Sequence, residues 1–118
     1  MGFNGRVAAI SEFALRQIER WCARRVPDTV REQLRFECRR RGRSVTLVQR
    51  RLPWTAEPGS TAEWIVHEFA QLRLGDDGRW SLYWRDRGGR WRPYPGCPSA
   101  PSPVPLLEEI DLDPEGRF

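Results

Sequence analysis

The chain has 118 residues, 39% of them hydrophobic and 31% charged, with a formal net charge of +4. It contains no run of about 18 apolar residues, which excludes a membrane-spanning helix, and no secretory start, so we expect a cytoplasmic protein. All 20 basic residues are Arg, which excludes the Schiff-base and P-loop chemistry that depends on Lys.

The first predicted element is a helix that begins after Ser11, a residue type suited to capping a helix N-terminus. Pro27 ends this helix near Arg25. Apolar residues recur at three- and four-residue spacing on one face of the helix, namely Ala14, Leu15, Ile18, Trp21 and Cys22. Residues 1–10 have neither a cap nor a clear period, so we expect a flexible N-terminus followed by one domain over residues 11–118.

From Leu34 the apolar residues alternate with polar ones, which predicts a strand and then a hairpin. The dipeptide Arg41-Gly42 is expected to form its two-residue loop, and the second strand is expected to end near Leu52. This register pairs Arg40 with Arg43, Cys38 with Val45, and Phe36 with Leu47. Residues 53–63 are rich in turn-forming residues and predict a surface loop.

Three further strands are predicted over residues 64–74, 79–87 and 90–94. A three-residue loop, Asp76-Asp77-Gly78, joins the first two, because it places Leu74 opposite Trp80 and gives Gly78 the left-handed position. By the same register Leu72 lies opposite Leu82. The dipeptide Gly88-Gly89 is expected to form a two-residue turn before the last strand.

Six prolines between residues 93 and 105 predict an extended segment that cannot be a central strand. Ser102 is expected to cap a short last helix that has Pro103 in its first turn and buries Leu106, Leu107 and Ile110. The elements together predict an α+β fold of two layers. It consists of an N-terminal helix, a five-stranded antiparallel sheet built from hairpins, and a short C-terminal helix.

The predicted registers sort the side chains of the sheet onto two faces. The apolar face collects Ala70, Leu72, Leu74, Trp80, Leu82, Trp84 and Trp91. The polar face is rich in Arg and Tyr, and on the last three strands it collects Phe69, Gln71, Arg73, Arg79, Ser81, Tyr83, Arg85, Arg87, Arg90, Arg92 and Tyr94. The first hairpin adds Arg35, Arg39, Thr46 and Arg50.

We interpret the polar face as the surface of a small non-enzymatic binding protein that needs no cofactor, with single-stranded nucleic acid or another anionic partner favoured. Arg binds phosphate bidentately and Tyr stacks on unpaired bases. The charge is uneven, since residues 1–51 hold 13 Arg and 5 acidic residues, whereas residues 52–118 hold 7 and 11. The expected binding residues are Arg73, Arg79, Tyr83, Arg85, Arg87, Arg90, Arg92 and Tyr94.

Other interpretations of the polar face stay open. The same residue types suit a protein–protein contact, so the chain could be an interaction subunit. A solvated face whose Arg residues pair with acidic neighbours explains the pattern without any partner and is the commoner outcome. The signature of RNA-binding sheets known as RNP is absent from the sequence.

Several titratable residues are candidates for chemistry. Asp86 is expected to form an ion pair or stabilise a turn, but with Glu68, placed opposite it on the apolar face, it could hold Mg²⁺ in a nuclease. His67, the only His, is expected on the polar face. The three cysteines Cys22, Cys38 and Cys97 lack the spacing of metal ligands or of a disulfide framework, so we expect no metal site.

Five segments carry a resemblance, namely residues 20–27, 50–54, 80–87, 90–94 and 107–118. They resemble a family of short bacterial proteins catalogued only as a domain of unknown function. The most specific of them is the run Trp-Ser-Leu-Tyr-Trp-Arg-Asp-Arg over residues 80–87, and the resemblance covers residues 12–118. It implies a stand-alone bacterial domain and carries no activity, cofactor or site residue.

Overall fold

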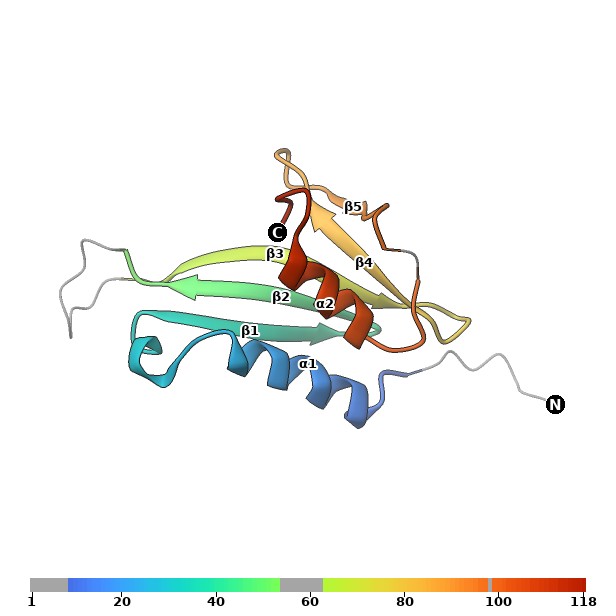
Figure 1. Cartoon of the computed structure of the whole chain (residues 1–118), viewed down its shortest axis with the longest axis horizontal. Coiled ribbons are helices and arrows are strands. Elements are labelled where there is room, and N and C mark those ends of the chain that lie inside the picture. Colours follow the sequence, from blue (N-terminus) through green and yellow to red (C-terminus); the bar gives the residue numbers. More distant parts are fainter. Residues whose placement is uncertain (1–8, 54–62, 98) are drawn as a thin grey trace.

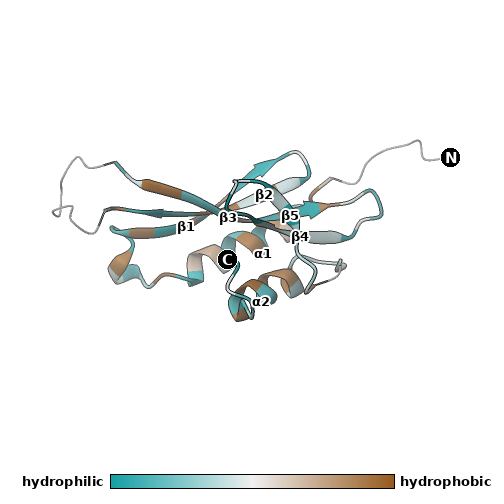
Figure 2. Ribbon diagram, turned by 90° about the horizontal axis from the view of Figure 1, so that it is seen from above, coloured by the Kyte–Doolittle hydropathy of each residue, from teal (hydrophilic) through white to brown (hydrophobic). Residues whose placement is uncertain are grey.

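The structure is a computed structural model that describes residues 9–53, 63–97 and 99–118. Two helices lie on one face of a five-stranded antiparallel sheet, whose strand order follows the chain order (Figures 1 and 2). The elements are α1 (Glu12–Arg24), a 3₁₀ turn (Asp28–Val30), β1 (Leu34–Arg41), β2 (Ser44–Arg51), β3 (Ile65–Leu74), β4 (Trp80–Arg85), β5 (Trp91–Pro93) and α2 (Val104–Leu112). The predicted α+β fold is therefore confirmed. Within the described ranges, no helix combines the length and apolarity needed to cross a bilayer.

The two helices bury the faces that their sequences predict. In α1, Ser11 Oγ accepts a hydrogen bond from the Ala14 amide at 3.1 Å, which confirms the predicted cap. In α2, the predicted cap at Ser102 is wrong, because the helix begins at Val104 with Pro103 in the capping position. Fewer amides need a cap there, since Pro105 has no N–H and the Leu106 amide already donates to the Pro103 carbonyl.

The β1–β2 hairpin turns one residue later than predicted. Arg41 pairs with Ser44, so the loop is Gly42-Arg43 and Cys38 lies opposite Leu47 rather than Val45. Gly42 has φ +59° and Arg43 has a negative φ, so only the first loop position demands glycine, as in a type II′ turn. The pairing has slipped by two residues, which keeps every side chain on its predicted face.

The β3–β4 hairpin has the predicted register. Leu74 pairs with Trp80 and Leu72 with Leu82, and Gly78 takes the left-handed conformation at φ +77°. The apolar residues of both strands therefore meet on the same side of the sheet, against the helices.

The β4–β5 turn is longer than predicted. The Asp86 amide donates to the Arg90 carbonyl at 2.9 Å, so the loop contains three residues, 87–89, and not the dipeptide Gly88-Gly89 alone. Gly89 has φ +80°, so its position matches that of Gly78 in the preceding hairpin.

The longer turn shifts the pairing of β5 by one residue, which exchanges its two faces. Arg92 pairs with Trp84, and Trp91 pairs with Arg85. Trp91, predicted on the apolar face, therefore lies on the opposite face, whereas Arg92 and Tyr94 lie on the helix side of the sheet. The predicted positions of these three side chains are wrong for this reason.

A β-bulge in β3 corrects three further positions. Leu47 pairs with Ala70 and Val48 with Glu68, so Phe69 has no partner of its own on β2. Phe69 is only 5% exposed and not on the polar face as predicted, because the bulge turns it toward the helices beside Ala70. Its ring contacts those of Trp21 and Phe36, with centroids 6.5 and 5.6 Å away. The bulge also reverses the predicted faces of His67 and Glu68.

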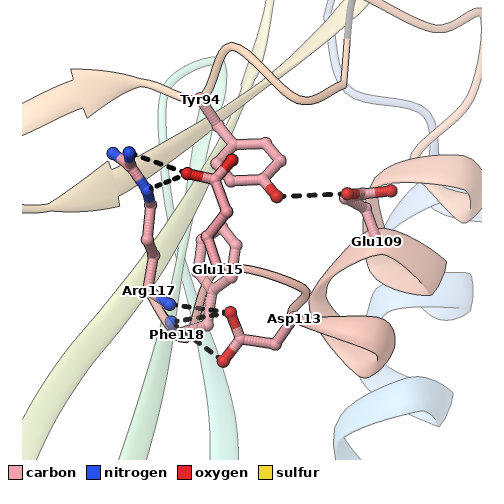
Figure 3. A network of polar contacts seen from close by, with 6 residues as sticks. All are labelled: Tyr94, Glu109, Asp113, Glu115, Arg117 and Phe118. Carbon is pink, nitrogen blue, oxygen red and sulfur yellow. Dashed lines mark hydrogen bonds and ion pairs between the residues drawn. The ribbon is translucent and has the colours of Figure 1, made fainter.

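The C-terminal segment closes over the helix side of β5 (Figure 3). The buried Tyr94 donates its hydroxyl to Glu109 at 3.1 Å, and its ring lies 5.2 Å from that of Phe118. Asp113 ends α2 with a left-handed backbone, φ 38°, and its carboxylate accepts hydrogen bonds from the amides of Arg117 and Phe118. Tyr94 is thus part of the core and not of the predicted polar face.

Candidate nucleic-acid interface on the open face of the sheet

The face of the sheet opposite α1 and α2 is covered by none of the described elements, and we call it the open face (Figure 2). The strand pairing assigns it six Arg and two Glu among its side chains. Its members are Arg35, Glu37, Arg39, Arg41, Ser44, Thr46, Val48, Arg50, Val66, Glu68, Gln71, Arg73, Ser81, Tyr83, Arg85, Trp91 and Pro93. The open face is therefore basic and contains two aromatic side chains.

Arginine side chains stack on aromatic rings at three places on this face. The Arg73 guanidinium lies 3.8 Å from the centre of the Tyr83 ring, and that of Arg85 lies 5.5 Å from Trp91. A third stack is formed by Trp64, which precedes β3 and lies below Arg35 at 4.9 Å and Arg50 at 5.5 Å. Such contacts are attractive because the ring face carries partial negative charge.

Polar contacts hold the same side chains in place. Arg50 forms an ion pair with Glu37 at 3.4 Å, and Arg85 pairs with Glu68. Gln71 donates to Thr46 at 2.9 Å and accepts from Arg73 at 2.6 Å, which links β2, β3 and the Arg73–Tyr83 stack. Two of the six Arg are thus paired with acidic neighbours, which is the arrangement expected of a solvated face. The other four have no carboxylate partner among the described residues.

The predicted binding residues fall into three groups. Arg73, Tyr83 and Arg85 lie on the open face as predicted. Arg79, Arg87 and Arg90 lie at the two turns, where Arg79 donates to the hydroxyl and carbonyl of Ser99 at 2.8 and 2.7 Å. Arg92 and Tyr94 lie on the helix side, because the longer β4–β5 turn shifts the pairing of β5 by one residue.

Sequence reasoning missed Trp91 and Trp64 as members of the surface. The Gly88-Gly89 pair fits a three-residue loop with glycine last as well as a two-residue one, and the first choice would have placed Trp91 beside Arg85. Trp64 begins the predicted strand 64–74, where unbroken alternation with Leu72 and Leu74 would place it on the apolar face. The bulge at Phe69 reverses that face, and it is the same bulge that moves Glu68.

Asp86 acts as the predicted turn-stabilising acceptor. Its carboxylate accepts hydrogen bonds from Arg92 Nε at 2.8 Å and from the Arg90 amide at 2.9 Å. These two donors hold the pKa of Asp86 below its usual value, because both stabilise the ionised form.

The alternative of a two-carboxylate metal site is not favoured by this arrangement. The bulge places Glu68 on the open face with Arg85, whereas Asp86 belongs to the helix side with Arg92. Glu68, Asp86 and His67 all line one hollow of about 440 Å³, but Arg85 and Arg87 line it too. Each of the two carboxylates is already paired with an Arg, Glu68 with Arg85 and Asp86 with Arg92. Within the described residues, no group of three or more His, Cys, Asp or Glu is placed to hold a metal ion.

Comparison with known proteins identifies a family but no characterised relative. A family model described as "Domain of unknown function (DUF3024)" matches residues 7–118, nearly the whole chain. No curated protein and no solved structure matches the chain. The match confirms the resemblance to a family of unknown function.

Proposed function

The chain belongs to the family described as Domain of unknown function (DUF3024), which names no activity, and we propose from the geometry that the open face is a binding surface for single-stranded nucleic acid. The observation that carries this proposal is the set of three Arg–aromatic stacks distributed over the open face. A stacked guanidinium keeps N–H groups at its edge that bind phosphate, and an aromatic ring beside it offers a surface for a base.

The dimensions of the open face suit an extended chain of several nucleotides. One row of side chains crosses all five strands, from Arg39 through Thr46, Gln71 and Tyr83 to Pro93. Four strand spacings give this row a length of about 19 Å. The Trp91 stack lies in the next row, with Arg85 and Glu68, and Trp64 contacts the row after that through Arg35 and Arg50. The three aromatic side chains therefore follow one another in the same direction along the strands.

The charge balance of the open face determines how binding should respond to salt. Glu37 and Glu68 compete with phosphate for Arg50 and Arg85. The four other Arg have no such competitor in the described part of the chain, and phosphates that bind them release counterions. Binding is therefore driven mainly by charge, with base stacking as a smaller and salt-independent contribution.

A protein partner is the second candidate for the same surface. Val66, on the open face, is 47% exposed, and Ile65 before it is 40% exposed. Exposed aliphatic residues next to Trp and Arg are typical of protein contacts rather than of phosphate binding.

The salt dependence of binding to a fluorescently labelled single strand tests the proposal. Five phosphate contacts give a slope of log affinity against log salt of about −3.5, at about −0.7 per contact. Arg85→Ala should make this slope shallower by about 0.7, because one contact is lost. Arg92→Ala is the matched control, since it removes the same charge and also breaks one ion pair, but on the helix side.

Two outcomes would contradict the proposal. Folded protein at tens of micromolar that does not bind at low salt does not have a nucleic-acid surface. Equal effects of Arg85→Ala and Arg92→Ala would show attraction by net charge and not by the open face. In the first case, capture of a protein partner that depends on Val66 and Arg85 becomes the explanation to test.

A further inference from the structure

Two of the three cysteines meet at a hollow between α1 and β1, away from the open face. Cys22 lies on the buried side of α1 and is 4% exposed, whereas Cys38 lies on the helix side of β1 and is half-buried. Both line a hollow of about 490 Å³ that opens to solvent and is also lined by Val26 and Phe36. One thiol is therefore shielded, and the other stands nearer the opening.

The two thiols interact directly and differ in acidity. The interaction with Cys22 lowers the pKa of Cys38, because the Cys22 thiol stabilises the Cys38 thiolate. The same interaction, together with burial, raises the pKa of Cys22. The more accessible sulfur is thus the better nucleophile, and the buried one keeps its proton.

We propose that Cys22 and Cys38 form a redox-active dithiol, which a hydroperoxide converts into a disulfide that links α1 to β1. The Cys38 thiolate attacks one oxygen of the peroxide, the O–O bond breaks, and the departing hydroxide takes a proton to become water, or an alcohol if the peroxide is organic. Cys38 is left as a sulfenic acid.

The second step uses the neighbouring thiol. The Cys22 sulfur attacks the Cys38 sulfur, the S–O bond breaks, and the Cys22 proton leaves with the hydroxide as water. With hydrogen peroxide, two thiols and one peroxide become one disulfide and two waters, so the two electrons lost by the sulfurs reduce the O–O bond. Both cysteines line the same hollow between α1 and β1, so the disulfide joins two elements that already pack against each other.

Cys97 provides the comparison within the same chain. Its pKa is raised, first by burial and then by the Glu109 carboxylate, so it holds its proton more tightly than Cys38 does. We expect hydroperoxide to react more slowly with Cys97 than with Cys38.

The test treats the reduced full-length protein with one equivalent of hydrogen peroxide and follows it by intact mass and by peptide mapping without reductant. We expect a mass loss of two hydrogens and a single cross-linked peptide pair that contains Cys22 and Cys38. Cys97→Ser is the control and should give the same product at the same rate. In Cys22→Ser the disulfide cannot form, and dimedone should capture the sulfenic acid on Cys38.

Other products would overturn the proposal. These are a disulfide that includes Cys97, a disulfide between two chains, sulfinic acid without any disulfide, or thiols that survive the peroxide unchanged. Because the unsubstituted chain decides each of these outcomes, the test holds even if Cys22→Ser fails to fold. Near-complete loss of peroxide consumption in Cys38→Ser is also expected, and an unchanged rate would contradict the assigned nucleophile.

Discussion

The two faces of the sheet show two different ways of arranging side chains on the same strands. On the helix side, Val45, Leu72 and Leu82 follow one another across β2, β3 and β4, with 0%, 0% and 2% exposure. On the open face the neighbouring row is Thr46, Gln71 and Tyr83, all half-buried. The first row is buried by helices packed above it. The second is shielded only by its own neighbours, through hydrogen bonds and Arg–ring stacks, so it remains accessible to a ligand.

The largest expected difference between the faces is in stability. Leu72→Ala should lower the free energy of unfolding by about 3 kcal/mol, because it leaves a cavity beneath the helices. Gln71→Ala, its neighbour on the open face, should cost under about 1.5 kcal/mol through lost hydrogen bonds. Urea denaturation of both variants measures the two values. Equal costs would mean that the two faces do not differ in how they stabilise the sheet.

A change at the centre of the open face should affect binding more than folding. If a base stacks on Tyr83, Tyr83→Ala should weaken single-strand binding by about 1–3 kcal/mol and leave the salt slope nearly unchanged. Ser81→Ala, on the same face of β4, is the control and should bind as the unsubstituted protein does. Fluorescence titration at two salt concentrations separates the two contributions. A changed slope would assign Tyr83 to positioning the Arg73 guanidinium rather than to a base.

The smallest expected effect concerns the Tyr94 hydroxyl, on the helix side. Tyr94→Phe should cost about 1 kcal/mol at neutral pH, because the hydrogen bond to Glu109 is lost. Burial and the Glu109 carboxylate raise the pKa of Tyr94, so this stabilisation is fully present below the unfolded value of about 10. The stabilisation is lost as the pH rises through the pKa that Tyr94 has in the folded protein.

Comparing the stability of the unsubstituted protein and of Tyr94→Phe at high pH provides a control for the Tyr94 prediction. The unsubstituted protein should lose stability relative to Tyr94→Phe as the pH rises above about 10, since only the former has a phenol to ionise at this position. Chemical denaturation across this range measures the difference. A constant difference would show that the hydroxyl is as exposed in the folded state as in the unfolded chain.

The two hairpins of β4 show where sequence reasoning succeeds and where it fails. In the β3–β4 turn only one loop length brings Leu74 and Trp80 to the same side, so the apolar pattern selects the register. In the β4–β5 turn, both loop lengths place an aromatic residue on each face, either Trp91 or Tyr94. Aromatic residues with a polar atom are stable on either face, so the apolar pattern does not select a loop length. Two of the eight expected binding residues, Arg92 and Tyr94, were assigned to the wrong side for this reason.

The β3 bulge was missed for a different reason. Adjacent apolar residues at Phe69 and Ala70 interrupt an alternating pattern, which is the only local signal of an extra residue in the strand. Whether both side chains can be buried depends on Trp21 and Phe36, which come from α1 and β1. The bulge is thus determined by tertiary packing, which a strand's own sequence does not reveal.

The order of the strands has a consequence for the two edges of the sheet. A sheet whose order follows the chain has two edges, and each edge is a template on which another chain could add a strand. At one edge, β1 carries Arg35, Arg39, Arg40 and Arg41, whose charges repel a second copy of itself. At the other, β5 is only three residues long and ends in Pro93, which has no N–H to offer. The part of β4 that β5 leaves uncovered is protected by Ala100, which exchanges two backbone hydrogen bonds with Trp80. Residues after β5 therefore occupy backbone groups of β4 on which a strand of another chain could otherwise pair.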